Sequence, residues 1–241
     1  MIKNMLTALC AAAALCASCD DGRIYEKEIV IPQEGLTLKM TGSFTGMDTW
    51  PSNYSLVLAS FKDDSESAQT STSVPLSANN SGEVTVKLSG LKGEVSDLEL
   101  CMIDRLRDRI VTFHSLTHDD IVAVNDTVYM NVGQVDVSMY KAIQTSVFDA
   151  KCISCHGANG GAPRSLYLTE GKSHDALVGK DSQAAPGYKL VEAGNAAASL
   201  LPIILSEDGL LHHNHADILE ARKKSNQIAL IRSWINNGAK E

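Results

Sequence analysis

Hydrophobic and polar residues change their pattern near residue 140 of this chain. Before that point, short stretches alternate between apolar and polar residues with a period of two, which is typical of β-strands with one buried face. Turn-forming segments separate the stretches, which are 36–40, 54–58, 84–88, 98–102, 110–113 and 128–132. Without helical stretches between them, they predict an antiparallel β-sandwich over residues 31–139.

From Tyr140 onward the pattern becomes helical. Ile143 and Val147 stand four residues apart, with Phe148 beside them. Near the end, residues 226–237 place Ile228, Ile231, Trp234 and Ile235 on one face, with Ser225 as a plausible N-cap and Gly238 as a stop. We therefore predict a mixed fold of two domains, in which an N-terminal all-β sandwich of immunoglobulin-like type precedes a helical domain at 140–241.

The N-terminus has the pattern of an export signal. Lys3 precedes an apolar stretch from residue 5 to residue 15, and the small residues Ala17 and Ser18 stand before Cys19. This order resembles a bacterial lipobox, although Cys16 stands where leucine is usual, and a plain secretory signal is the alternative. We predict a lipoprotein signal peptide at 1–18, lipidation of Cys19 and a linker at 19–30, which together anchor the protein to a membrane outside the cytoplasm.

Charge and cysteine usage fit this placement. The chain has 241 residues, six cysteines and a formal net charge of -8, so nucleic acid is not expected as a partner. Three of the cysteines belong to the signal region, which leaves Cys101, Cys152 and Cys155 in the mature chain. Cys101 lies in a predicted strand between apolar residues, where a small packed side chain is expected rather than a reactive thiol.

The strongest chemical motif is Cys-Ile-Ser-Cys-His at residues 152–156. Two thiols at this spacing fit the two vinyl groups of one haem, and the following histidine is suited to bind its iron. The same pair of cysteines also occurs in redox dithiols and in zinc sites. A dithiol would be expected near a βαβ pattern, and zinc would require further ligands such as the distant histidines at 212–215. The motif favours covalent attachment of haem.

Residues 140–241 resemble a bacterial class I c-type cytochrome domain with a single haem. The matching segments occur in the family's order at 151–157, 166–168, 195–201 and 234–239. The resemblance implies an all-α, cytochrome c-like bundle over 140–241. It also implies one covalent haem c attached to Cys152 and Cys155, with His156 as the proximal iron ligand.

The second iron ligand departs from the family pattern. The family usually provides a methionine shortly before the last helix, but no methionine follows Met139. His215, His212 and His213 occupy that position, and we rank them in this order as candidate distal ligands; a surface metal patch is the alternative for this cluster. His174 is a weaker candidate. Two histidine ligands would lower the reduction potential relative to a histidine and methionine pair.

These observations predict a membrane-tethered, monohaem c-type cytochrome that passes single electrons between redox partner proteins, with the β-sandwich as a spacer. We expect it at the periplasmic face or at the outer-membrane surface. Two alternatives stay open: a haem-binding or sensing module without a carrier role, and a zinc-binding lipoprotein with cysteine and histidine ligands. An enzyme is not expected, because no second cofactor motif and no acid–base pair accompany the haem motif.

Overall fold

The computed structural model describes residues 35–62, 65–78, 82–92, 97–158 and 162–241. Residues 34–241 form one compact unit by their contacts. The predicted signal peptide at 1–18, the lipidated Cys19 and the linker at 19–30 lie outside the described residues. The predicted domain boundary between residues 139 and 140 stays a prediction.

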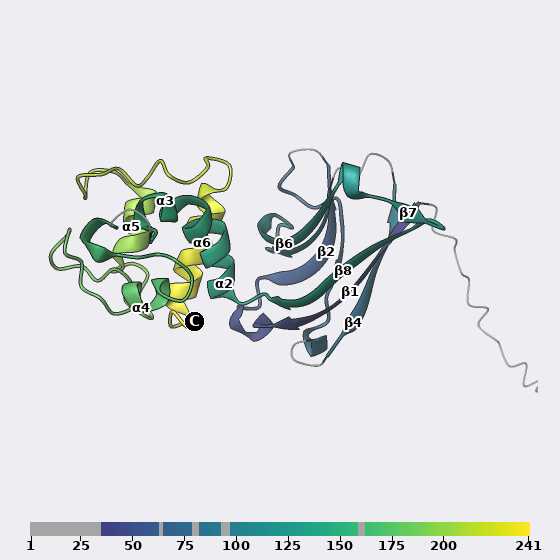
Figure 1. Cartoon of the computed structure of the whole chain (residues 1–241), viewed down its shortest axis with the longest axis horizontal. Helices are drawn as coiled ribbons and strands as arrows, with labels where there is room; N and C mark the ends of the chain where they lie inside the picture. Colours follow the sequence, from purple (N-terminus) through teal and green to yellow (C-terminus); the bar gives the residue numbers. More distant parts are fainter. Residues whose placement is uncertain (1–34, 63–64, 79–81, 93–96, 159–161) are drawn as a thin grey trace, which may run out of the picture. The chain divides into compact units, whose positions relative to one another are not determined.

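Two four-stranded sheets make up the first part of the described chain (Figure 1). Their strand orders are β4-β1-β8-β7 and β3-β2-β5-β6. The strands are β1 Leu36–Thr45, β2 Ser55–Phe61, β3 Thr70–Ser73, β4 Val84–Leu91, β5 Asp97–Ile103, β6 Arg109–Thr117, β7 Ala123–Val124 and β8 Thr127–Asp136. All six predicted stretches overlap a strand. The β3 strand was not predicted because it contains only serine and threonine, and β7 is too short to show a period.

The prediction of a purely antiparallel sandwich is wrong at one pairing. Strand β1 runs parallel to β8, from Thr37 opposite Thr127 to Thr45 opposite Asp136. The other strand pairs are antiparallel. A parallel pair cannot be joined by a tight hairpin, so these two strands come from opposite ends of the β-region. No local turn signal in the sequence could reveal this pairing.

The apolar core lies between the two sheets and continues into the helical part. Leu38 and Met40 of one sheet and Leu58 and Leu100 of the other are fully buried in the same cluster. Strands β2 and β5 also bury side chains on their other face, where Cys101 lies at 0% exposure in a second, smaller cluster. Cys101 is therefore a packed residue, as expected, and burial raises the pKa of its thiol far above the usual range.

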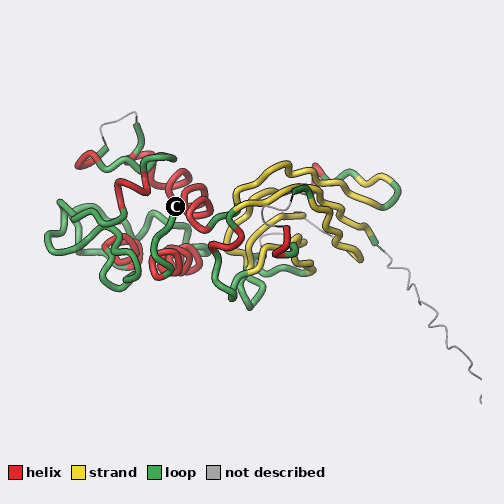
Figure 2. Tube along the Cα trace, turned by 90° about the horizontal axis from the view of Figure 1, so that it is seen from below, coloured by secondary structure: helices red, strands yellow, loops and turns green. Residues whose placement is uncertain are grey.

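The prediction of an all-α, cytochrome c-like bundle is wrong. The structure contains mostly β-sheet, and its second part consists of short helices joined by long loops (Figure 2). The α- and π-helices are α2 Met139–Ile143, the π-helix η4 Gln144–Cys152, α3 Ile153–His156, α4 Ser173–Leu177, α5 Leu200–Ser206 and α6 Lys224–Asn236. The 3-10 turns are η1 Met47–Thr49, η2 Leu76–Ala78, η3 His118–Asp120 and η5 Pro163–Ser165. No helix among these described residues is long and apolar enough to cross a membrane.

Glycines explain why the middle of this part is not a bundle. Gly171, Gly179, Gly187 and Gly194 all have positive φ, which interrupts helices at short intervals. Isolated β-bridges connect the loops instead, and they join Val178 to Val191, Asp181 to Lys189 and Lys189 to Ser199. The apolar patterns at both ends do form helices, but the segment between them is mostly irregular.

One continuous helical run carries the cysteine motif. It extends through α2, η4 and α3, and its predicted apolar face of Ile143, Val147 and Phe148 is fully buried. The central part is π-helical rather than α-helical, so the amide of Ile153 bonds to the carbonyl of Phe148, five residues earlier. Single π-helical turns are frequent at functional sites.

The last helix was predicted at residues 226–237. It begins two residues earlier, at Lys224, and ends one residue earlier, at Asn236. Ser225 lies inside α6 rather than at its N-cap, and the chain turns at Gly238 with φ 94°. Trp234 is buried, and its ring lies 5.2 Å from the ring of Tyr140 in α2. The two ends of the helical part therefore pack on each other.

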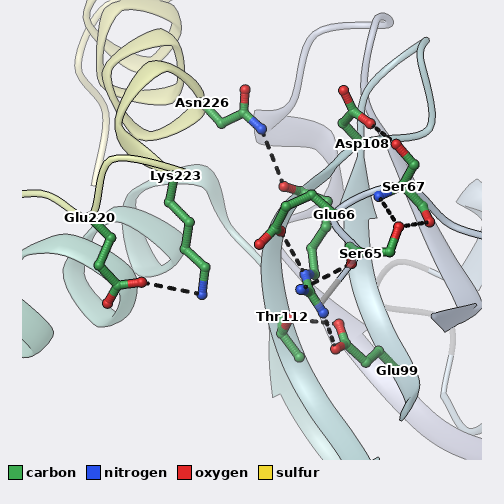
Figure 3. A network of polar contacts seen from close by, with 10 residues as sticks. Ser65, Glu66, Ser67, Glu99, Asp108, Thr112, Glu220, Lys223 and Asn226 are labelled. Carbon is green, nitrogen blue, oxygen red and sulfur yellow. Dashed lines mark hydrogen bonds and ion pairs between the residues drawn. The ribbon is translucent and has the colours of Figure 1, made fainter. Parts of the chain in front are cut away.

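A polar network in the β-sandwich also contacts α6 (Figure 3). Arg109 donates hydrogen bonds to the carboxylates of Glu99 and Glu66, and the Thr112 hydroxyl donates to Glu99 over 2.7 Å. Glu99 is only 4% exposed. The Asn226 side-chain amide donates to the carbonyl of Arg109 over 3.5 Å. This buried ion pair thus lies at the strand that contacts the last helix.

Candidate haem attachment site

The two cysteines of the motif lie one helical turn apart on the same run. Cys152 ends η4 and is half-buried, whereas Cys155 lies exposed in α3, and both are free thiols. Burial raises the pKa of Cys152 to about 11, with smaller contributions from Cys155 and Asp149. The motif therefore presents one half-buried and one exposed thiol on the same helical run.

His156 has its orientation fixed by backbone bonds. Its Nδ1 lies 2.9 Å from the Leu166 carbonyl oxygen, which can only accept, so Nδ1 carries the proton. The neutral ring then has its lone pair on Nε2, where a metal ion can bind. The amide of Leu168 also donates to the His156 carbonyl over 2.9 Å. A hydrogen bond from one ring nitrogen to a backbone carbonyl is the contact that commonly orients a metal-binding histidine.

Gly157 permits the chain to turn away directly after His156. A Cβ atom at this position would lie 2.4 Å from the carbonyl oxygen of Ile153, which is too close for any other residue without a shift of the backbone. The glycine therefore lets the chain leave α3 and return past the histidine ring at residues 166–168. This return brings the second segment of the sequence resemblance next to the first.

A buried polar network holds the returning segment against the helical run. Gln144 is 1% exposed, and its Nε2 donates to the Leu168 carbonyl over 3.0 Å and to Asp149 over 2.7 Å. The Ser173 hydroxyl donates to the side-chain oxygen of Gln144 and also bonds to the Tyr140 hydroxyl. Sequence analysis did not identify Gln144, because an isolated glutamine in a helix gives no signal of its partners.

His215 is the half-buried member of the predicted histidine cluster. Its Nδ1 lies 2.8 Å from the His213 carbonyl, so its lone pair is also on Nε2. Burial lowers the pKa of His215, and charges on His213 and His156 lower it further, against the hydrogen bond to His213. The next residue, Ala216, is buried and anchors the chain there.

The other predicted histidines are placed differently. His212 and His213 are exposed, and the His213 ring stands perpendicular to that of His215 at 5.1 Å. His174 donates from Nε2 to the Ala239 carbonyl over 2.7 Å and packs against the rings of Tyr140 and Trp234. With Nε2 occupied in this way, His174 stabilises the C-terminal packing.

Two lysines near the site were not predicted from the sequence. Lys151 forms an ion pair with Glu220 at 2.6 Å, and Lys224 donates to the Ala216 carbonyl over 2.6 Å. Both contacts join segments far apart in the chain or across a loop, and no periodic pattern marks them. They connect the segment that carries His215 to the motif helix and to α6.

No group of three or more histidine, cysteine, aspartate or glutamate side chains in the described part of the chain is arranged to hold a metal ion. Cys19 lies outside the described residues. Comparisons with protein-family models, with curated proteins and with solved structures gave no significant match.

Proposed function

We propose that Cys152 and Cys155 hold one haem covalently, that His156 binds its iron, and that the protein transfers single electrons. The observation that carries the proposal is the fixed tautomer of His156, whose Nδ1 donates to the Leu166 carbonyl and whose Nε2 is free to bind iron. Two free thiols stand on the same helical run immediately before it. When bound, haem supplies an iron that alternates between two oxidation states one electron apart.

The thiols suit the attachment chemistry. Each Sγ–H adds across one vinyl group, so a carbon–sulfur and a carbon–hydrogen bond form while the S–H bond and the vinyl π bond break. No other reactant is consumed. The separation of one helical turn lets Cys152 and Cys155 react with the two vinyl groups of a single ring.

His215 is our candidate for the second iron ligand. Its Nδ1 bonds to the His213 carbonyl, which leaves the lone pair on Nε2, and the ring is half-buried. Two imidazole ligands would give a lower reduction potential than an imidazole and a thioether. We therefore place the protein among low-potential electron carriers, with other redox proteins as partners.

The location follows from the N-terminal signal. We propose that Cys19 carries a lipid that tethers the chain to a membrane outside the cytoplasm, where c-type haem is attached. The β-sandwich would then separate the haem from the membrane. Replacing Cys19 by alanine should release the protein from the membrane fraction, and an unmodified mature N-terminus at another residue would contradict lipidation.

The central experiment produces the full chain in cells with and without machinery for c-type haem maturation. We expect a denaturing gel stained for haem to show a signal that Cys152→Ala and Cys155→Ala each weaken and that the double variant abolishes. Cys101→Ala is the matched control, because it removes a thiol from the β-sandwich and should leave the stain unchanged. Protein that contains zinc and no iron, or haem that extracts into acidified solvent, would contradict the proposal.

A further inference from the structure

Lysine side chains connect the segment that carries His215 to the rest of the protein at two points. We propose that Lys151 and Lys224 are positioning residues, which hold residues 212–220 against the motif helix and α6 so that His215 can serve as the distal ligand. This inference rests on the proposed function, because it concerns the second ligand of the proposed haem. It goes further by naming the residues that would keep the second ligand in place at the proposed haem.

Lys151 connects the C-terminal end of the segment, at Glu220, to the motif helix. It directly precedes Cys152, and its Nζ lies 2.6 Å from Glu220 Oε1. The hydrogen bond from Lys151, and then its charge, are the largest causes of the lowered pKa of Glu220. Lys223 adds a second cation 3.9 Å from the other carboxylate oxygen.

Lys224 connects the backbone next to His215, at Ala216, to α6. Its Nζ donates over 2.6 Å to the carbonyl of Ala216, which immediately follows His215. A bond from a charged donor to a backbone acceptor is stronger than a neutral one. Lys224 is the first residue of α6, so this bond fixes the backbone beside His215 relative to a helix that packs on the motif run.

The segment between these two contacts is already ordered by local bonds. Asn214 accepts from the Ala216 amide over 2.7 Å and donates to Asp217 over 2.8 Å, and Leu219 is buried. These contacts stabilise the internal conformation of the loop. Its position as a unit depends on contacts with the rest of the protein, and the two lysines provide polar contacts of this kind.

Exposed ion pairs contribute little to global stability, so a purely structural role and a positioning role predict different results. The test uses haem-loaded full-length protein and measures the rate at which carbon monoxide binds the reduced iron. We expect Lys151→Ala and Lys224→Met to raise this rate several-fold, with Lys224→Met giving the larger increase. Urea denaturation of Lys151→Ala should be nearly unchanged.

Two controls make the experiment specific. Lys141 lies on the same helical run as Lys151, but its ion pair is with Glu170, which is outside the His215 segment. Lys141→Ala should therefore leave the rate of carbon monoxide binding unchanged. Exchanging the charges in Lys151→Glu with Glu220→Lys should restore the slow rate. High salt should imitate Lys151→Ala.

The outcomes separate this inference from the proposed function. His215→Ala should give the fastest binding of carbon monoxide. If His215→Ala opens the iron and neither lysine variant changes the rate, the positioning role is wrong while the proposed ligand stands. If His215→Ala leaves the rate unchanged, both the distal assignment and the positioning role are wrong. If Lys224→Met does not fold, Lys151→Ala and the charge exchange decide the matter.

Discussion

The β-sandwich at residues 35–136 buries its apolar residues on regular strand faces, whereas the helical part at 139–241 combines buried apolar residues with individual polar contacts around the cysteine motif. In the sandwich, strands β2 and β5 bury nearly every side chain. In the helical part, the segments around the cysteine motif are held by single bonds such as those of Gln144, Lys151 and Lys224. Each such bond can be removed by one substitution.

The difference indicates where function can be altered without unfolding the protein. Each residue of a buried β-strand packs against many neighbours, so its replacement mainly changes the free energy of unfolding. The returning segment at 166–168 and the loop at 212–220 are positioned by few contacts each, and these contacts surround His156 and His215. Substitutions in the two parts should therefore separate into those that change stability and those that change the properties of the proposed haem.

The largest effect on stability is expected in the sandwich, from Arg109→Met. This change leaves the buried Glu99 without its cation, and removal of one partner of a buried ion pair costs about 3–5 kcal/mol. Urea denaturation at neutral pH should show the loss. The haem spectrum of the folded protein should stay the same, because Arg109 lies in the β-sheet and outside the motif helix.

The pH dependence of that variant has a definite sign. Burial raises the pKa of Glu99 already in the wild type, against the effects of Thr112 and Arg109. A carboxyl with a raised pKa binds its proton more tightly in the folded state, so its contribution to stability is present at low pH and is lost as the pH rises through the folded pKa. Arg109→Met should thus be least damaging in acid. Equal damage at all pH values, or no relief when Glu99→Leu is added, would contradict the role of this pair.

A smaller effect on stability, but a clear effect on the haem, is expected from Gln144→Leu. The change removes the donor to the Leu168 carbonyl and to Asp149, at a cost of about 1–3 kcal/mol. It also loosens the segment that accepts from His156, so the reduction potential should shift. Potentiometry and urea denaturation together test this.

Gln227→Leu is the matched control for Gln144→Leu. Gln227 is also a buried glutamine of the helical part, and its Nε2 donates to the Ser146 carbonyl over 3.0 Å. This bond reaches the motif run at Ser146 rather than the 166–168 segment, so replacing Gln227 should change stability without moving the potential. A shift of equal size in both variants would show that the helical part responds as a whole.

His174→Ala should cost about 1 kcal/mol, which is the usual net contribution of one hydrogen bond. The lost bond is the one to the Ala239 carbonyl, and the aromatic contacts with Tyr140 and Trp234 are also removed. The visible spectrum should be unchanged, because Nε2 of His174 is committed to this bond. A new ability to bind carbon monoxide would reinstate His174 as an iron ligand.

The sequence predicted regular elements better than the contacts between them. Alternation located six of the strands, and the apolar spacing located the helical run around Val147 and the helix ending at Asn236. The parallel pairing of β1 with β8 joins distant segments and leaves no local pattern. The all-α bundle was wrong because glycines with positive φ keep most of residues 162–199 out of helices.

The candidate site was found in the same uneven way. The spacing of Cys152, Cys155 and His156 is local, so the motif could be read directly. The partner of His156, the Leu166 carbonyl, is a backbone atom, and no side-chain pattern reveals it. For the histidine cluster, sequence order alone could not distinguish residues that differ mainly in burial.

The smallest effect on stability and on the spectrum is expected from His212→Ala. This variant is informative because His215→Ala, in the same cluster, should change the spectrum. His212 is exposed, and surface substitutions usually change stability by less than about 0.5 kcal/mol. His213→Ala should also be mild, because the alanine retains the backbone carbonyl that accepts from His215 Nδ1. His215→Ala alone should change the spectrum and admit carbon monoxide. If instead all three variants keep the wild-type spectrum, the cluster is a surface patch. If His212→Ala alone opens the iron, the loop must rearrange when haem binds, because the more exposed ring would then be the ligand.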